Sequence, residues 1–108
     1  MGTTRKVAIA STFFAAVLGL APAAAMASTV YVGSNYAYNT GTTKVTACDG
    51  EKDGNSVYSD YIGSSSGRIL TSGGSGTCAS ATTSGLTSFN VCEQKPLQSD
   101  SCSSRVYL

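Results

Sequence analysis

Four cysteines constrain this chain of 108 residues more than any other feature: Cys48, Cys78, Cys92 and Cys102. In a short exported chain, an even number of cysteines is typical of a disulfide framework. Three pairings exist, and we favour Cys92–Cys102 because the intervening EQKPLQSDS contains a proline and can turn back; Cys48–Cys78 then follows. A four-cysteine zinc site would use paired C-x2-C spacing, which is absent. We therefore expect a small domain held by two disulfides.

The N-terminus predicts export. Arg5 and Lys6 form a positive region, an apolar run covers residues 7–20, and Ala25-Met26-Ala27 matches an A-x-A cleavage site. This three-part arrangement is typical of a secretory signal peptide. The apolar run is shorter than the roughly 20 residues that span a bilayer. We expect cleavage after residues 1–27 and a secreted, extracellular product.

The remaining residues, 28–108, form a single small domain whose composition argues against several functions. Arg5 and Lys6 leave with the signal peptide, so the whole-chain charge of +1 becomes nearly neutral. This leaves no basic patch for nucleic acid and no cationic amphipathic helix for a membrane surface.

Catalysis is also disfavoured. The chain has no histidine, which removes Ser-His-Asp and Cys-His catalysis and histidine-ligated metal sites. A carboxylate pair such as Asp53 and Asp60 remains, but a domain of this size has little room for the deep cleft that would tune it. We expect no enzyme activity and no cofactor.

Short strands separated by Gly, Ser, Asn and Asp clusters dominate the mature sequence, and no 3.6-residue period is sustained. This pattern predicts an all-β fold, a compact antiparallel β-sandwich or barrel. The predicted strands are 29–32, 36–38, 42–48, 56–62, 68–72, 86–93 and 103–108. The predicted core is Val45, Val57, Tyr61, Ile69, Leu86, Phe89, Val91 and Val106.

Two segments are harder to interpret. Residues 71–85 are poor in large apolar side chains, so we expect a long surface loop held by Cys78. Residues 28–41 fit either an edge strand or an extended arm that packs against another molecule.

The stretch CDGEKDGN approaches a calcium-binding loop. Asp49, Glu51 and Asp53 alternate, Gly54 follows, and Asp60 comes after five further residues, close to D-x-[DN]-x-[DN]-G-x5-E. However, Glu51 is longer than the expected Asp or Asn, and Asp60 is shorter than the bidentate Glu that ends the motif. We therefore favour a polar hairpin loop over a metal site.

Tyrosine supplies most of the aromatic side chains, and tryptophan is absent. Tyr36 and Tyr38 alternate with small residues, so they share one face of an extended segment, and Tyr31 precedes them. Tyrosine suits half-buried strands, but it also provides large contact areas at interfaces. We take Tyr31, Tyr36 and Tyr38 as candidate partner-binding residues.

The run VTACDGEKDGNSVYSDY, with the later GTC and VCE…DSCS, resembles small secreted disulfide-bonded β-proteins of actinobacteria. One such group is the small adaptor subunit of umbrella toxin particles. That resemblance implies a non-enzymatic domain that joins a lectin-like subunit to a large toxin through its N-terminal segment, here YVGSNYAYNTG. The partner would be another secreted protein.

A second resemblance leads to an alternative function. DYIGSSSGRIL is similar to a hairpin of the tendamistat-type α-amylase inhibitors, which are small exported β-sandwiches with two disulfides. Their Trp-Arg-Tyr triplet is missing here. The alternative is thus an inhibitor of some extracellular hydrolase, which would use either SSSG at 64–67 with Arg68 or the Cys92–Cys102 loop.

Overall fold

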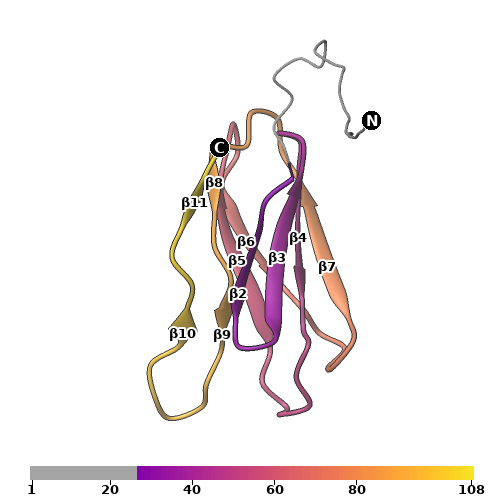
Figure 1. Ribbon diagram of the computed structural model, residues 1–108, viewed down its shortest axis with the longest axis vertical. Coiled ribbons are helices and arrows are strands. Elements are labelled where there is room, and N and C mark those ends of the chain that lie inside the picture. Colours follow the sequence, from indigo (N-terminus) through magenta and orange to yellow (C-terminus); the bar gives the residue numbers. More distant parts are fainter. Residues whose placement is uncertain (1–26) are drawn as a thin grey trace, which may run out of the picture.

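The computed structural model describes residues 27–108, so the predicted signal peptide lies outside the described residues except for Ala27. The described chain is all-β, as predicted (Figure 1). Within it, no helix is long and apolar enough to cross a membrane. The strands are β2 (Thr29–Val32), β3 (Asn35–Thr40), β4 (Lys44–Cys48), β5 (Val57–Ile62), β6 (Gly67–Leu70), β7 (Cys78–Thr82), β8 (Ser88–Phe89), β9 (Cys92–Glu93), β10 (Ser101–Cys102) and β11 (Val106–Tyr107).

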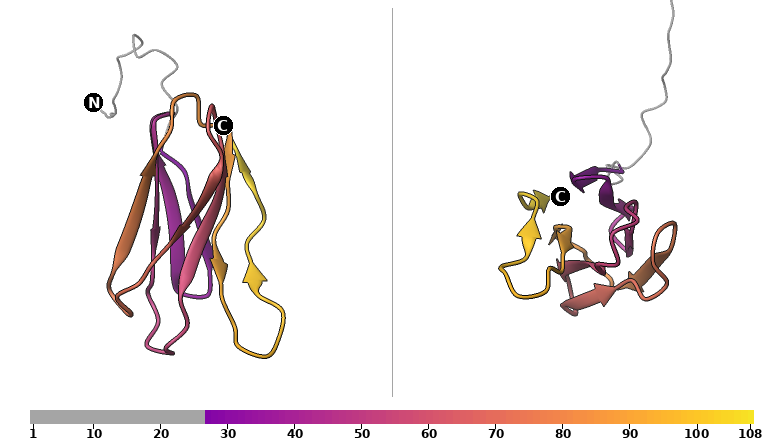
Figure 2. Two further views of the ribbon diagram at one scale, coloured as in Figure 1. Left: turned by 180° about the vertical axis from the view of Figure 1, so that it is seen from behind. Right: turned by 90° about the horizontal axis from the view of Figure 1, so that it is seen from below.

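The strands form two antiparallel sheets that curl into a half-barrel (Figure 2). The first sheet has the order β2-β3-β4-β7, and the second has the order β10-β9-β5-β8-β11 with β6 paired to β5. Each sheet presents an apolar face to the other, which is how a small β domain removes apolar side chains from water. The predicted sandwich or barrel with two disulfides is confirmed.

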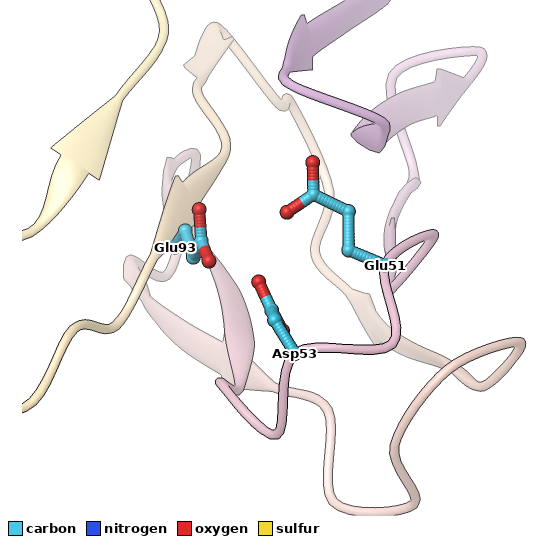
Figure 3. A group of neighbouring side chains, drawn as sticks. All are labelled: Glu51, Asp53 and Glu93. Carbon is cyan, nitrogen blue, oxygen red and sulfur yellow. The ribbon is translucent and has the colours of Figure 1, made fainter.

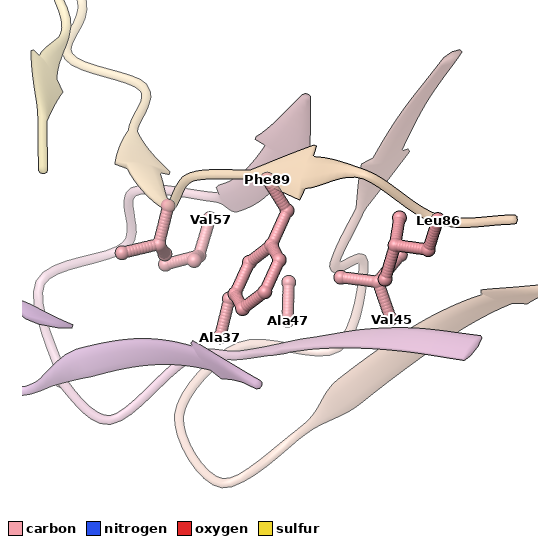
Figure 4. Packing of buried hydrophobic residues seen from close by; sticks show 7 residues of the cluster. Ala37, Val45, Ala47, Val57, Leu86 and Phe89 are labelled. Carbon is pink, nitrogen blue, oxygen red and sulfur yellow. The ribbon is translucent and has the colours of Figure 1, made fainter. Parts of the chain in front are cut away.

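A compact core fills the space between the sheets (Figure 4). Its buried members are Ala37, Val45, Ala47, Val57, Leu86, Phe89 and Val91, and Val30, Val32, Tyr61, Ile69, Ala81 and Val106 pack against them. All eight predicted core residues belong to one of these two sets. Ala37 and Ala47 were not predicted, because alanine occurs on any surface and its burial depends on the two sheets coming together.

Both disulfides have the favoured pairing, Cys48–Cys78 and Cys92–Cys102. Each joins residues that lie directly opposite one another on adjacent antiparallel strands, with Cα atoms 4.1 and 4.0 Å apart. The first connects β4 to β7 inside one sheet, and the second closes the loop between β9 and β10.

The expectation of a long loop over residues 71–85 was wrong. β7 pairs with β4 over five positions, from Lys44↔Thr82 to Cys48↔Cys78. Its side chains are all small or hydroxylated, and their exposure alternates, with Ala79 and Ala81 half-buried. Because Ala, Ser and Thr give a weak apolar signal, this alternation is not recognisable from sequence.

The predicted strands 86–93 and 103–108 are each interrupted. β8 and β9 keep one register against β5 but separate at Asn90, whose side-chain oxygen accepts a hydrogen bond from the Asp60 amide. Of the predicted strand 103–108 only β11 is regular, and β10 comes before it; Arg105 lies between the two. Its guanidinium donates to the Ser88 hydroxyl at 2.8 Å and to the Asp60 carbonyl at 3.0 Å. Side chains therefore replace part of the main-chain ladder at this point.

Candidate functional site

Residues 29–40 form a hairpin at one end of the first sheet. β3 lies inside this sheet, paired with β2 on one side and with β4 on the other. β2 is therefore the edge strand, and the segment is not a free arm. Its four residues, TVYV, include no charged residue and no proline, although natural edge strands commonly use charges, prolines or bulges to prevent pairing with other chains. This edge is open to an additional strand.

The ladder geometry identifies the unpaired backbone groups of β2. Hydrogen-bonded and non-hydrogen-bonded pairs alternate along an antiparallel ladder, and the Asn39 amide donates to the Ser28 carbonyl. In this register the pair two residues further on, Val30 with Ala37, is also hydrogen-bonded. The amide and carbonyl groups of Thr29 and Tyr31 consequently point away from β3, toward the open edge.

Three tyrosines cover the outer face of the hairpin beside this edge. Tyr31 lies directly opposite Tyr36, and their ring centroids are 5.7 Å apart. Tyr36 and Tyr38 stack along β3 with centroids 6.3 Å apart and ring planes at 20°. Tyr31 is 61 % exposed, whereas Tyr36 and Tyr38 are half-buried. The structure thus brings the three predicted contact residues together in one aromatic row, the kind of rigid surface that contributes strongly to interfaces.

Side-chain hydrogen bonds fix the hairpin at both ends, one from Glu51 outside the hairpin and one from Asn39 within it. Gly33, with φ at 63°, occupies the first position of the two-residue turn, where a II′ turn requires positive φ. A Cβ atom at this glycine would collide with the Glu51 carboxylate, which accepts a 2.8 Å hydrogen bond from the Ser34 amide. At the other end, the Asn39 side-chain oxygen accepts from the Ser28 amide at 2.7 Å. β2 is thereby held in an extended conformation before any partner arrives.

The acidic stretch after Cys48 is not a hairpin loop, contrary to the prediction. It connects β4 in the first sheet to β5 in the second. Asp49 is buried, and its side chain accepts from the Glu51 amide. Asp60 lies on β5 and forms a two-point ion pair with Arg68, with the closest contact at 2.6 Å. The calcium-loop spacing of the sequence therefore does not reflect one set of converging side chains.

The crossing instead brings Glu51 and Asp53 close to Glu93 on β9 (Figure 3). One carboxylate oxygen of each lies within 4.8 Å of the others. The hydrogen bond between Asp53 and Glu93 raises the pKa of Glu93 and lowers the pKa of Asp53. Asn55 also donates to Glu93 at 2.8 Å. The contacts of Asp53 and Asn55 with Glu93 tie the crossing segment to β9. Sequence spacing could not have revealed Glu93 as the third carboxylate of this group.

The first segment proposed for an inhibitory role is engaged within the molecule. Ser64 and Ser65 form hydrogen bonds with Thr83 and Ser84. The guanidinium of Arg68 lies 3.9 Å from the centre of the Tyr58 ring, and its hydrogen bond to Asp60 raises its pKa. A side chain committed to two internal partners is poorly suited to act as a free probe of a hydrolase cleft.

The loop closed by Cys92–Cys102 is anchored to the second sheet through Tyr58. Its hydroxyl donates to Asp100 at 2.6 Å, and the Lys95 amide donates to the same carboxylate at 3.3 Å. Burial, together with this carboxylate, raises the pKa of Tyr58 to about 12, while the Tyr58 hydroxyl lowers the pKa of Asp100. The sequence did not indicate the hydrogen bond between Tyr58 and Asp100, because these residues are 42 positions apart.

Comparisons with protein-family models, curated proteins and solved structures found no match. Among the surface features of the described residues are the β2 edge with its tyrosine row and the tip of the Cys92–Cys102 loop; exposed large apolar side chains also occur elsewhere, at Ile62, Leu70, Tyr107 and Leu108.

Proposed function

We propose that the mature domain is a non-catalytic, secreted protein-interaction module, an adaptor subunit that binds another secreted protein through β2. The observation that supports this proposal best is the open edge of β2. The groups of Thr29 and Tyr31 that face outward match the main-chain pairing by which an extended segment adds a strand to a sheet. The tyrosine row would then supply side-chain contacts next to the added strand.

The other edge of the same sheet is less suitable. β7 lies against β6 of the second sheet, so a strand added there would meet a neighbour on one face. β11 and β10 are only two residues long and offer few main-chain groups. β2 combines four residues of regular pairing with β3 and an exposed tyrosine.

A test uses the tagged mature domain as bait in culture supernatant of the source organism. Thr29→Pro removes one outward amide without removing a bond to β3, since proline has no N–H to donate. We expect this variant to lose the partner while its thermal midpoint stays close to that of the wild type. Tyr31→Ala should weaken binding of the same partner about 10- to 100-fold, as expected for an aromatic contact residue.

Thr82→Pro is the matched control. Thr83 donates its amide to the Thr43 carbonyl, so by alternation the amide of Thr82 points away from β4 on the opposite edge. This variant should retain the partner. Deletion of residues 28–39 is unsuitable, because it would remove the buried Ala37 from the core. Recovery of a hydrolase whose binding is indifferent to Thr29→Pro would favour the inhibitor alternative.

A further inference from the structure

The half-barrel is closed on one side and open on the other. On the closed side, β7 of the first sheet lies against β6 of the second. In the second sheet, β5 has β6 on one side and β8 and β9 on the other, so β11 and β10 form its outer edge. No ladder among the described strands joins this edge to β2. The end-on view in Figure 2 shows the opening between β2 and the segment that contains β10 and β11.

β11 has unpaired main-chain groups at this opening, as β2 does. The amide of Leu108 donates to the Thr87 carbonyl at 2.9 Å. Because hydrogen-bonded and non-hydrogen-bonded pairs alternate along an antiparallel ladder, the amide and carbonyl of Tyr107 point away from β8. β11 is too short to bind a strand alone. Together with the outward groups of Thr29 and Tyr31, however, it gives the opening main-chain donors and acceptors on both borders.

The two borders also carry apolar side chains. Val30 and Val32 of β2 and Val106 of β11 pack against the buried core, yet each of them is only half-buried. Tyr31, Tyr107 and Leu108 are exposed large apolar residues of the same two borders. A strand placed between β2 and β11 would therefore satisfy main-chain groups and remove apolar surface from water at the same time.

We propose that this opening receives one extended segment of the secreted partner, which pairs with β2 on one side and with β11 on the other and so closes the barrel. The inference rests on the proposed function and adds the kind of segment that binds. A strand that pairs on both sides needs both of its own edges free. The segment therefore comes from a tail or linker of the partner and not from a sheet. Its side chains that face the half-buried valines are apolar, and they alternate with outward-facing residues.

The same requirement argues against a second copy of this domain as the occupant. In a folded copy β2 is already paired with β3, and β11 is already paired with β8. Each of these strands has only one free edge, so neither can pair on both sides at once.

Photo-crosslinking tests whether one segment touches both borders. Benzoylphenylalanine replaces Tyr31 in one variant and Tyr107 in another, and the exposed Leu70 of β6, on the closed side, is the control position. Each variant is irradiated with the purified partner that the wild-type bait captures, and mass spectrometry maps the crosslinked peptides. We expect positions 31 and 107 to crosslink within the same stretch of about ten residues of the partner, the length of a single strand. Position 70 should not crosslink that stretch.

A second test measures the contribution of the apolar border on β11. Val106→Thr replaces a methyl group by a hydroxyl, and it should raise the Kd for the partner about 3- to 10-fold, since an apolar contact with the inserted strand is lost. Ile69→Thr is the matched control, because Ile69 also packs half-buried against the core but lies on β6. This control should lower the urea midpoint and leave the Kd within about twofold of the wild type, as expected for a distant site.

The outcomes separate this inference from the proposed function. If Thr29→Pro abolishes binding but position 107 gives no crosslink, or crosslinks a different segment from position 31, strand addition to β2 stands and closure of the barrel is overturned. A Kd that is indifferent to Val106→Thr would overturn closure as well, and so would crosslinks found only between two copies of the domain. If the bait captures no partner, or if Thr29→Pro retains it fully, both proposals fail.

Discussion

Removal of the two disulfides should destabilise the domain by different amounts. In the chain-entropy model, the free energy that a disulfide contributes depends on the length of the loop it closes. The separations of 30 residues for Cys48–Cys78 and 10 for Cys92–Cys102 give about 3.6 and about 2.7 kcal/mol. Small domains have total stabilities of only about 5–15 kcal/mol, so either loss is a large fraction.

Removal of the two disulfides should also affect different parts of the structure. Cys48 and Cys78 lie in a ladder of five pairs, so their double alanine variant should keep its structure locally and unfold cooperatively at lower urea. Cys92 and Cys102 belong to two-residue strands, so their removal should also expose the loop between them to proteases.

Urea unfolding followed by circular dichroism gives the free energies, and limited proteolysis reports on the loop. The reasoning is refuted if loss of the shorter loop costs more than loss of the longer one, or if neither costs more than about 1 kcal/mol.

Two further predictions concern titrating groups. The pKa of Glu93 is raised by its hydrogen bond to Asp53, so its contribution to stability is present below its ordinary pKa and is lost as the pH rises through the raised value. Glu93→Gln should therefore be at least as stable as the wild type at pH 7, with the advantage disappearing in acid; urea midpoints across this pH range check it, and an advantage that grows in acid would contradict it. The pKa of Tyr58 is raised to about 12, so its neutral form stabilises the fold below pH 10 and this contribution is lost as the pH rises toward 12. Ultraviolet titration should show one tyrosine ionising near pH 12 that is missing from Tyr58→Phe, and the same variant should be nicked faster between residues 93 and 101; a titration curve identical to that of the wild type would refute the assignment.

Much of the fold could be predicted from the sequence, because its main determinants are local. Phe89 and Val91 indicated apolar positions that are buried in the core, although the strand itself breaks at Asn90, and the proline between Cys92 and Cys102 favours the shorter disulfide loop. β7 could not be predicted for the opposite reason: its two alanines are half-buried only because β4 lies beside them, and its other residues are exposed. Where the apolar alternation of a segment is weak, contacts with residues distant in the sequence thus decide whether the segment forms a strand.

The candidate site shows the same division. The tyrosine row follows from two-residue spacing within β3 and a tight turn to Tyr31, both of which are local. The sequence pattern grouped Asp60 with the carboxylates after Cys48, but Asp60 pairs with Arg68. The third carboxylate beside Glu51 and Asp53 is Glu93. Glu93 follows Asp53 by 40 positions, and only the crossing between the sheets brings them together.

Residue-resolved amide hydrogen exchange of the mature domain, with and without its partner, tests the central proposal most directly. The amides of Val30 and Val32 belong to hydrogen-bonded pairs with β3 and should be protected from exchange in the free domain. The amides of Thr29 and Tyr31 face the open edge and should exchange quickly there. Strand addition along β2 predicts that the partner slows exchange at Thr29 and Tyr31. A partner that binds tightly and leaves exchange at both residues unchanged would contradict the account.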